Sequence, residues 1–91
     1  MQWKESELEQ PVAVVADQDL QEIILHNDDV NTFEHVIVCL MEICGHDPIQ
    51  AEQCASIVHY NGKCSVKRGA LRKLRPLCEA LCQKGLSADI Q

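Results

Sequence analysis

Residues 22–44 read EIILHNDDVNTFEHVIVCLMEIC, and this stretch decides the fold. Its first five residues, 22–26, form a short segment with an apolar, β-branched centre, which predicts a strand. Residues 27–32 form a polar segment that contains residue types favouring turns, and they predict a loop. Asn31 is then the expected N-cap of a helix, with Glu34 three residues later as in a capping box. The helix has apolar residues at spacings of three and four, namely Phe33, Val36, Ile37, Leu40, Met41 and Cys44.

Three further elements and a short last strand are expected after Gly45, which ends the first helix. Asp47 and Pro48 open a second helix that ends at Asn61-Gly62. Residues 63–67 alternate and predict a strand. Gly69 is expected to start a third helix, within which Pro76 predicts a kink or a second start. Residues 87–91 complete the series as a short strand.

The element order is therefore β-α-α-β-α-β. It predicts a small α+β sandwich in which three helices cover one face of a three-stranded antiparallel sheet. We assign residues 22–91 to this domain. Residues 1–21 are acidic and polar, with a short apolar run at 12–16 after Pro11, and are expected to form a flexible N-terminal arm.

Composition narrows the function. The 91 residues, 46% hydrophobic and 24% charged, suit one globular domain, and no apolar run approaches the roughly 20 residues of a membrane span. Aromatic residues are 3% and the net charge is −6, which argues against nucleic acid as the main partner. Residues 1–10 lack the apolar core of a signal peptide, so a cytoplasmic protein is expected. At this size a binding module is favoured over an enzyme.

Charge is unevenly distributed along the chain. Residues 1–34 contain nine acids and one base, whereas five bases gather in a short stretch: Lys67, Arg68, Arg72, Lys73 and Arg75. Two interpretations remain open. The bases form either a solvated helix face or a docking surface for an acidic partner.

Six cysteines raise the question of a metal or disulfide framework. None forms a Cys-x-x-Cys pair, and four of them fall on the apolar stripes of the expected helices. We expect free thiols that pack as small hydrophobes, with a metal site and disulfides as weaker alternatives. No cofactor is expected.

The densest polar cluster is Asn27-Asp28-Asp29, between the first strand and the first helix. Its carboxylates and amide carbonyl are acceptors that suit an ammonium group. A hard metal ion is a second interpretation, although the Asp-x-Asp-x-Asp-Gly calcium loop is missing; a simple turn with a helix cap is a third. His59, near the end of the second helix, is either a binding group or a structural or exposed histidine. No nucleophile–base motif is recognisable.

Four segments together resemble the ClpS family: His26–Asp29, Phe33–Ile37, Ala51–Gln53 and Val58–Lys63. Members are adaptors that deliver N-degron substrates to a Clp-type AAA+ unfoldase and its protease, and the resemblance covers residues 22–91. It implies a non-enzymatic, monomeric adaptor that docks on the N-terminal domain of the unfoldase and recognises an N-terminal Leu, Phe, Tyr or Trp. A variable or acidic arm before the domain also fits the family.

The resemblance assigns roles residue by residue. It implies that Asn27, Asp28, Asp29 and His59 surround the α-amino group of the substrate. The first side chain of the substrate then enters an apolar pocket formed by Leu25, Asn31, Phe33, Val36, Ala55 and Ala88. Lys73 corresponds to a basic residue that docks on the unfoldase. Three positions depart from the family pattern: Asn31 replaces a Thr, and Phe33 and Ala55 each replace a Met.

Two other classes of function remain as alternatives. The first is a translation-related or general protein-interaction module, because the C-terminal domain of the ribosomal stalk protein has a similar fold, and fold does not fix function. The second is a small metalloenzyme, which would need zinc on the cysteines. Peptides that differ only in their N-terminal residue separate the adaptor from the interaction module.

Overall fold

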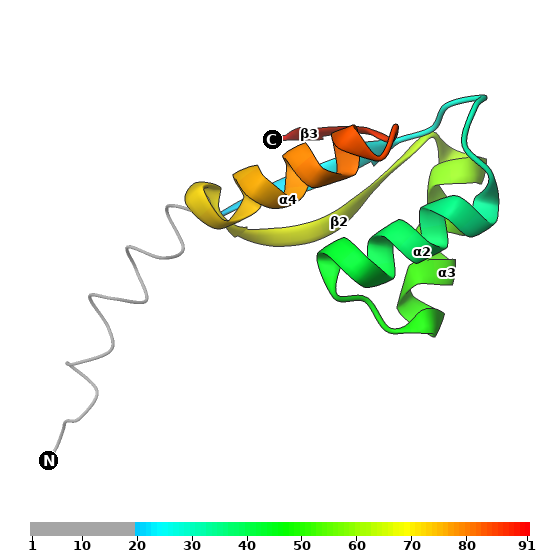
Figure 1. Ribbon diagram of the computed structural model, residues 1–91, viewed down its shortest axis with the longest axis horizontal. Helices are drawn as coiled ribbons and strands as arrows, with labels where there is room; N and C mark the ends of the chain where they lie inside the picture. Colours follow the sequence, from blue (N-terminus) through cyan, green and yellow to red (C-terminus); the bar gives the residue numbers. More distant parts are fainter. Residues whose placement is uncertain (1–19) are drawn as a thin grey trace, which may run out of the picture.

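Three antiparallel strands form one sheet in the spatial order β2-β1-β3 in the computed structural model, which describes residues 20–91 (Figure 1). The elements follow the predicted order. They are β1 (Leu20–His26), α2 (Phe33–Cys44), α3 (Pro48–Asn61), β2 (Lys63–Ala70), α4 (Leu71–Gln83) and β3 (Ser87–Ile90). The expected arm lies outside the described residues, except that Leu20 and Gln21 belong to β1.

The central strand β1 carries the core of the sheet. Ile23 and Leu25 are buried, whereas the alternate residues between and beside them remain partly exposed. Because successive side chains of a strand point to opposite faces, only one face of β1 is fully covered. Leu25 lies opposite Cys64 on β2 and Ala88 on β3.

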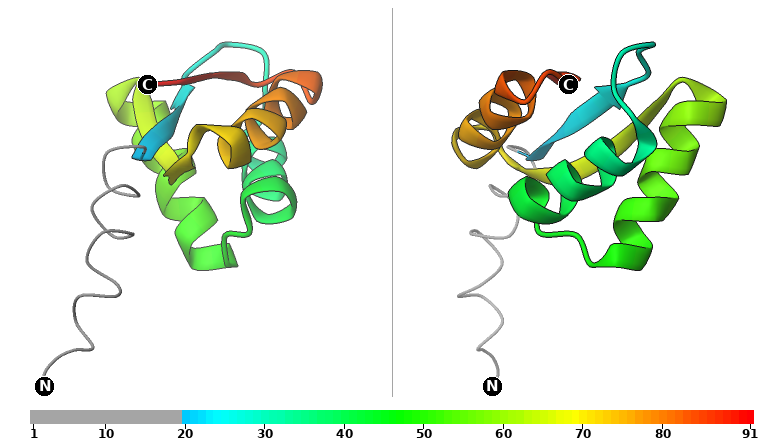
Figure 2. Two further views of the ribbon diagram at one scale, coloured as in Figure 1. Left: turned by 90° about the vertical axis from the view of Figure 1, so that its left-hand side faces the viewer. Right: turned by 45° about the vertical axis from the view of Figure 1, so that its right-hand side comes forward.

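The helices pack on this face with α2 in the middle, since α2 contacts both α3 and α4 (Figure 2). Leu40 of α2 and the two leucines Leu74 and Leu81 of α4 are buried beside Ile23 and Leu25 in one hydrophobic core. The predicted α+β sandwich is therefore confirmed. Within residues 20–91, no helix is long and apolar enough to cross a membrane.

The N-cap of α2 is Thr32, not Asn31 as predicted. The Thr32 hydroxyl accepts a hydrogen bond from the backbone N–H of His35 at 3.0 Å. The side chain of Asn31 is directed elsewhere, because its Nδ2 donates to Asp28 and to the carbonyl of Gly85. The capping box with Glu34 is therefore wrong as well. By contrast, Asp47 caps α3 as expected, with Pro48 in the first turn.

The boundary between β2 and α4 also differs from the prediction. Strand β2 continues to Ala70, so Gly69 lies in a strand and does not start the helix. The reason is the partner strand: β1 begins two residues earlier than expected, and Leu20 and Gln21 pair with Ala70 and Gly69. Helix α4 then runs without interruption through Pro76, which therefore marks no second start.

A buried histidine holds the connection between α2 and α3 against β2. The Nε2 atom of His46 donates to the carbonyl of Val66 at 2.7 Å, and the ring is 6% exposed. Lys67 reaches back from β2 and donates from Nζ to the carbonyl of Cys44 at 3.1 Å. Two polar contacts thus satisfy backbone carbonyls that neither a helix nor a sheet ladder satisfies.

Candidate functional site

The loop after β1 is organised around the carboxylate of Asp28. Its Oδ1 atom accepts from the backbone N–H groups of Val30 at 2.9 Å and Asn31 at 2.8 Å, and its Oδ2 atom accepts from Nδ2 of Asn31 at 2.9 Å. These bonds favour the charged form, and those from Asn31 contribute most, so the pKa of Asp28 lies below its ordinary value. A fixed, ionised carboxylate therefore stands in the loop.

The same loop is fastened to the turn between α4 and β3. Asn31 Nδ2 also donates to the carbonyl of Gly85 at 2.8 Å. In the first turn of α2, His35 Nε2 donates to the carbonyl of Lys84 at 2.9 Å. Gly85 has φ +91°, a conformation that side chains rarely adopt, so glycine suits this turn. The loop conformation thus depends on a turn more than fifty residues away in the chain.

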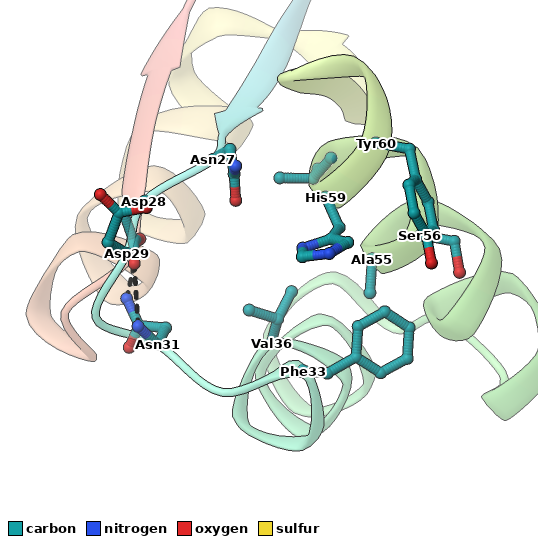
Figure 3. A pocket seen from close by; sticks show the side chains of 11 residues that line it. Asn27, Asp28, Asp29, Asn31, Phe33, Val36, Ala55, Ser56, His59 and Tyr60 are labelled. Atoms are coloured by element: carbon teal, nitrogen blue, oxygen red, sulfur yellow. Dashed lines mark hydrogen bonds between the residues drawn. The ribbon is translucent and has the colours of Figure 1, made fainter.

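A backbone hydrogen bond brings the other end of the loop to α3. The N–H of Asn27 donates to the carbonyl of Gly62 at 2.9 Å. Gly62 is the C-cap of α3, and His59 lies in the last turn of that helix. The side chains of Asn27 and His59 therefore project into the same recess, from the loop and from the helix respectively (Figure 3).

This recess has a volume of about 590 Å³ and two kinds of wall. Its apolar lining comes from α2 and α3 and consists of Phe33, Val36, Ala55 and Val58. Its polar lining consists of Asn27, Asp28, Asp29, Asn31, Ser56, His59 and Tyr60. Figure 3 shows Asp28, Asp29 and Asn31 across the recess from His59 and Tyr60. The size is within the roughly 300–1,000 Å³ typical of small-ligand sites.

The structure brings together eight of the residues assigned from the sequence: Asn27, Asp28, Asp29, Asn31, Phe33, Val36, Ala55 and His59. Leu25 and Ala88 do not line the recess. Leu25 is 1% exposed and belongs to the core. It lines a hollow of about 20 Å³ that shares five residues with the recess, namely Asn27, Asp28, Asn31, Val36 and Val58. Ala88 lies opposite Leu25 on β3 and packs against the core. Lys73 is exposed on α4 and is not part of the lining.

Three lining residues were not assigned to the site from the sequence, namely Ser56, Val58 and Tyr60. Ser56 lies one helical turn before His59 and Tyr60, and spacings of three and four place side chains on neighbouring positions of a helix. Tyr60 is 80% exposed, and its ring packs edge-on against the ring of His59 with centroids 4.8 Å apart. Helical spacing from His59 is the signal that could have found the first and last of these residues.

The cysteines take no part in this recess. All six are free, and five are buried or packed against the core as expected, whereas Cys82 is exposed. Burial raises the pKa of Cys44 to about 11 and that of Cys54 to about 12, so both remain neutral thiols and are poor nucleophiles. Within residues 20–91, no group of three or more His, Cys, Asp or Glu side chains is arranged to hold a metal ion.

The recess is suited to a ligand with a cationic donor at one end and an apolar group at the other. An ionised carboxylate has about four acceptor positions, so Asp28 keeps capacity beyond its three loop bonds, and Asp29 is exposed beside it. The apolar walls lie next to these acceptors. Fold and recess together define a small ligand-binding module.

Comparison with known proteins identifies the class. The family model described as ATP-dependent Clp protease adaptor protein ClpS matches residues 16–89. The chain therefore belongs to the ClpS family of Clp protease adaptors, whose members are not catalytic. As an adaptor of the ATP-dependent Clp protease, it has the Clp unfoldase as its partner.

A curated relative supports this placement, and a solved structure shares the fold. The ClpS adapter protein of Thermosynechococcus vestitus is 36% identical over 66 residues, which are 71% of this chain and 70% of that protein. The structure of Agrobacterium tumefaciens ClpS2 bound to L-phenylalaninamide superimposes with a TM-score of 0.74 at 19% identity, covering 80% of this chain and 95% of that one. The second likeness concerns the fold.

Proposed function

We propose that this adaptor binds the free N-terminal residue of N-degron substrates, of the Leu, Phe, Tyr or Trp type, and delivers them to the Clp unfoldase. The observation that carries the proposal is that polar acceptor groups and apolar side chains line the same recess. Asn27, Asp28, Asp29 and His59 stand beside walls formed by Phe33, Val36, Ala55 and Val58. An α-amino group bonded to a carbon that bears an apolar side chain has the same two parts.

The ligand of the structural neighbour has this composition too. L-phenylalaninamide, to which the Agrobacterium protein is bound, carries a free α-amino group and a phenylalanine side chain. A bulky apolar side chain gains about 1.5–3 kcal/mol on full burial. Hydrogen bonds from the ammonium to carboxylate and amide oxygens then distinguish an N-terminal residue from the same residue inside a chain, which has no ammonium.

Delivery completes the proposed function. The adaptor acts as a monomer on the N-terminal domain of the unfoldase, with Lys73 as one docking residue and Leu25 and Ala88 supporting the recess from the core beneath it. Cytoplasmic reducing conditions would keep the six free thiols reduced. Lys73 lies on α4, which contributes no residue to the lining of the recess, so the proposed docking residue and the proposed ligand site share no residue.

The test is a series of peptides that differ only in their first residue, measured with the natural protein and with His59→Ala. Peptides that start with Leu, Phe, Tyr or Trp should bind, and those that start with Ala or Ser should bind at least tenfold more weakly. His59→Ala should weaken the apolar series by roughly 1–3 kcal/mol because a buried ammonium loses one of its partners. Fluorescence titration measures both effects.

Gln53→Ala is the matched control, because Gln53 is exposed on α3 and does not line the recess. Its affinities should equal those of the natural protein. His59 is exposed, so His59→Ala should change the free energy of unfolding by only about 0.5 kcal/mol. Equal affinities across the whole peptide series, or a collapse of the fold in His59→Ala, would contradict the proposed role.

The side chain at position 55 should set how the site treats β-branched residues. Ala55 lies four residues before His59 on α3 and lines the same recess. A Met there would crowd the Cβ atom of the first residue of the substrate, and Val and Ile branch at that atom. We therefore expect Ala55→Met to increase the preference for Leu over Ile by about 1 kcal/mol or more. The measurement is a pair of affinities for Leu-initiated and Ile-initiated peptides.

Ile57→Met provides the control, since Ile57 is 41% exposed on the same helix and outside the lining. It should leave the Leu-to-Ile ratio unchanged. Phe33 lines the recess from α2 and opposes the effect only if its ring leans over the ligand. An unaltered ratio in Ala55→Met would show that position 55 does not shape the bound side chain.

A further inference from the structure

Five exposed bases lie close together in the chain, at the end of β2 and the start of α4. These bases, which we term the basic surface, are Lys67, Arg68, Arg72, Lys73 and Arg75. No acid occurs between residues 63 and 78, although the whole chain has a net charge of −6. Within residues 20–91, no ion pair involves any of these five side chains. No ion pair therefore compensates the basic surface in this part of the chain, and Glu22 of β1, opposite Arg68 of β2, is the acid nearest to it in the sheet register.

The start of the described chain lies directly beside this surface. Leu20, the first residue of β1, pairs with Ala70, and Gln21 pairs with Gly69. Ala70 is the N-cap of α4 and makes no side-chain cap hydrogen bond. Figure 1 accordingly shows the beginning of β1 next to the first turn of α4. Whatever precedes Leu20 thus enters the domain at the edge of the basic surface.

The preceding residues have the complementary charge. Residues 1–19 contain five acids and a single base, Lys4; the acids are Glu5, Glu7, Glu9, Asp17 and Asp19. Asp17 and Asp19 are three and one residues before Leu20. An extended chain spans about 3.3–3.6 Å per residue, and five residues of helix rise about 7.5 Å. Both aspartates can therefore reach Arg72, Lys73 and Arg75 with no intervening linker.

We propose that the acidic segment, residues 5–19, docks on the basic surface of its own molecule and competes there with any acidic partner. Each exposed ion pair on its own is weak, because water and salt screen it. Because the segment is attached to the domain through Leu20, its effective concentration at the basic surface is on the order of millimolar. A free acidic peptide would have to reach a similar concentration to compete with it. A stronger acidic partner displaces the segment, and displacement both exposes the bases and releases the segment. This arrangement is independent of the ligand that the recess binds.

The test compares three forms of the full chain. The segment variant is Glu9→Gln with Asp17→Asn and Asp19→Asn. The matched control is Glu34→Gln with Glu42→Gln and Glu52→Gln, which removes the same charge from exposed positions on α2 and α3. Backbone amide chemical shifts of residues 67–75 are recorded for each form between about 0.01 M and about 1 M salt, where the Debye length falls from ~30 Å to ~3 Å.

At low salt, the natural protein and the control should share amide shifts in residues 71–75 that the segment variant lacks. At high salt all three forms should converge, because screening removes the docked state. Identical shifts in all three forms at low salt would overturn the proposal. So would low-salt shifts that change on dilution, because they would assign the contact to the segment of a second copy.

An acidic probe gives a second measurement. A labelled hexaglutamate peptide should bind the segment variant several-fold more tightly than the natural protein at low salt, since its competitor is weakened. Adding Arg72→Gln and Lys73→Gln to the segment variant should abolish that gain. Equal affinity of the probe for the natural protein and the segment variant would show that residues 5–19 do not occupy the surface.

Discussion

Acetylation of the N-terminus of a Leu-initiated peptide is expected to weaken its binding to this protein by at least tenfold. The modification removes the positive charge and two of the three donors of the ammonium group. Asp28 and Asp29 would then face a neutral amide, and acceptors desolvated by the bound peptide would be left unpaired. A loss of roughly 1–3 kcal/mol follows for each such group, and each 1.4 kcal/mol corresponds to a factor of ten in affinity.

The control is the same peptide acetylated on an internal lysine and left free at its N-terminus. It carries the same change in charge at a position that does not enter the recess, so its affinity should match that of the unmodified peptide. Fluorescence anisotropy with each peptide measures the difference. If the two acetylated peptides bind alike, the assignment of Asn27, Asp28, Asp29 and His59 to an ammonium is wrong.

Leu40→Ala is expected to lower the free energy of unfolding by about 2–5 kcal/mol. Leu40 is 0% exposed and lies at the centre of the core, in the helix between α3 and α4. Truncation removes buried methyl groups and leaves a cavity that the close-packed surroundings fill only in part. Because α2 also supplies Phe33 and Val36 to the recess, peptide binding should be lost in parallel with the fold.

Val38→Ala is the companion variant on the same helix. Val38 is 47% exposed, so its truncation should cost only about 0.5 kcal/mol. Urea denaturation of both variants, with the midpoint and slope compared, separates a change in stability from a change in the unfolded state. Similar costs for the two truncations would mean that α2 does not face the core as the structure has it.

Element order could be predicted from the sequence because local signals were strong. Residues that typically end or start helices mark the limits of α2 and α3 in the sequence. Gly45 ends α2, Asp47 and Pro48 begin α3, and Gly62 ends α3. The errors concern contacts between distant residues. Asn31 was expected to cap α2, but its amide is engaged by Gly85, fifty-four positions away.

The same limit explains the other differences. The end of β2 depends on its pairing with Leu20 and Gln21, which a local alternation of residues does not reveal. Eight residues named through the family resemblance line the recess, whereas Leu25 lies in the core and Ala88 packs against it. Whether the side chain of a strand residue lines a recess or is buried beneath it depends on how the following loop packs over the strand.

The bonds that fasten the loop after β1 make ligand binding a property of the whole domain. One end of the loop is tied to Gly62 and the other to Gly85, so the recess is complete only when α3, α4 and β3 are all in place. Partly folded or truncated chains would then fail to bind substrate, so only completely folded adaptors would recognise it. Conversely, a bound ligand favours the folded chain, by about 2.7 kcal/mol when its concentration is 100 times its Kd. Occupied adaptors are thus the better protected ones in a cell that degrades unfolded chains.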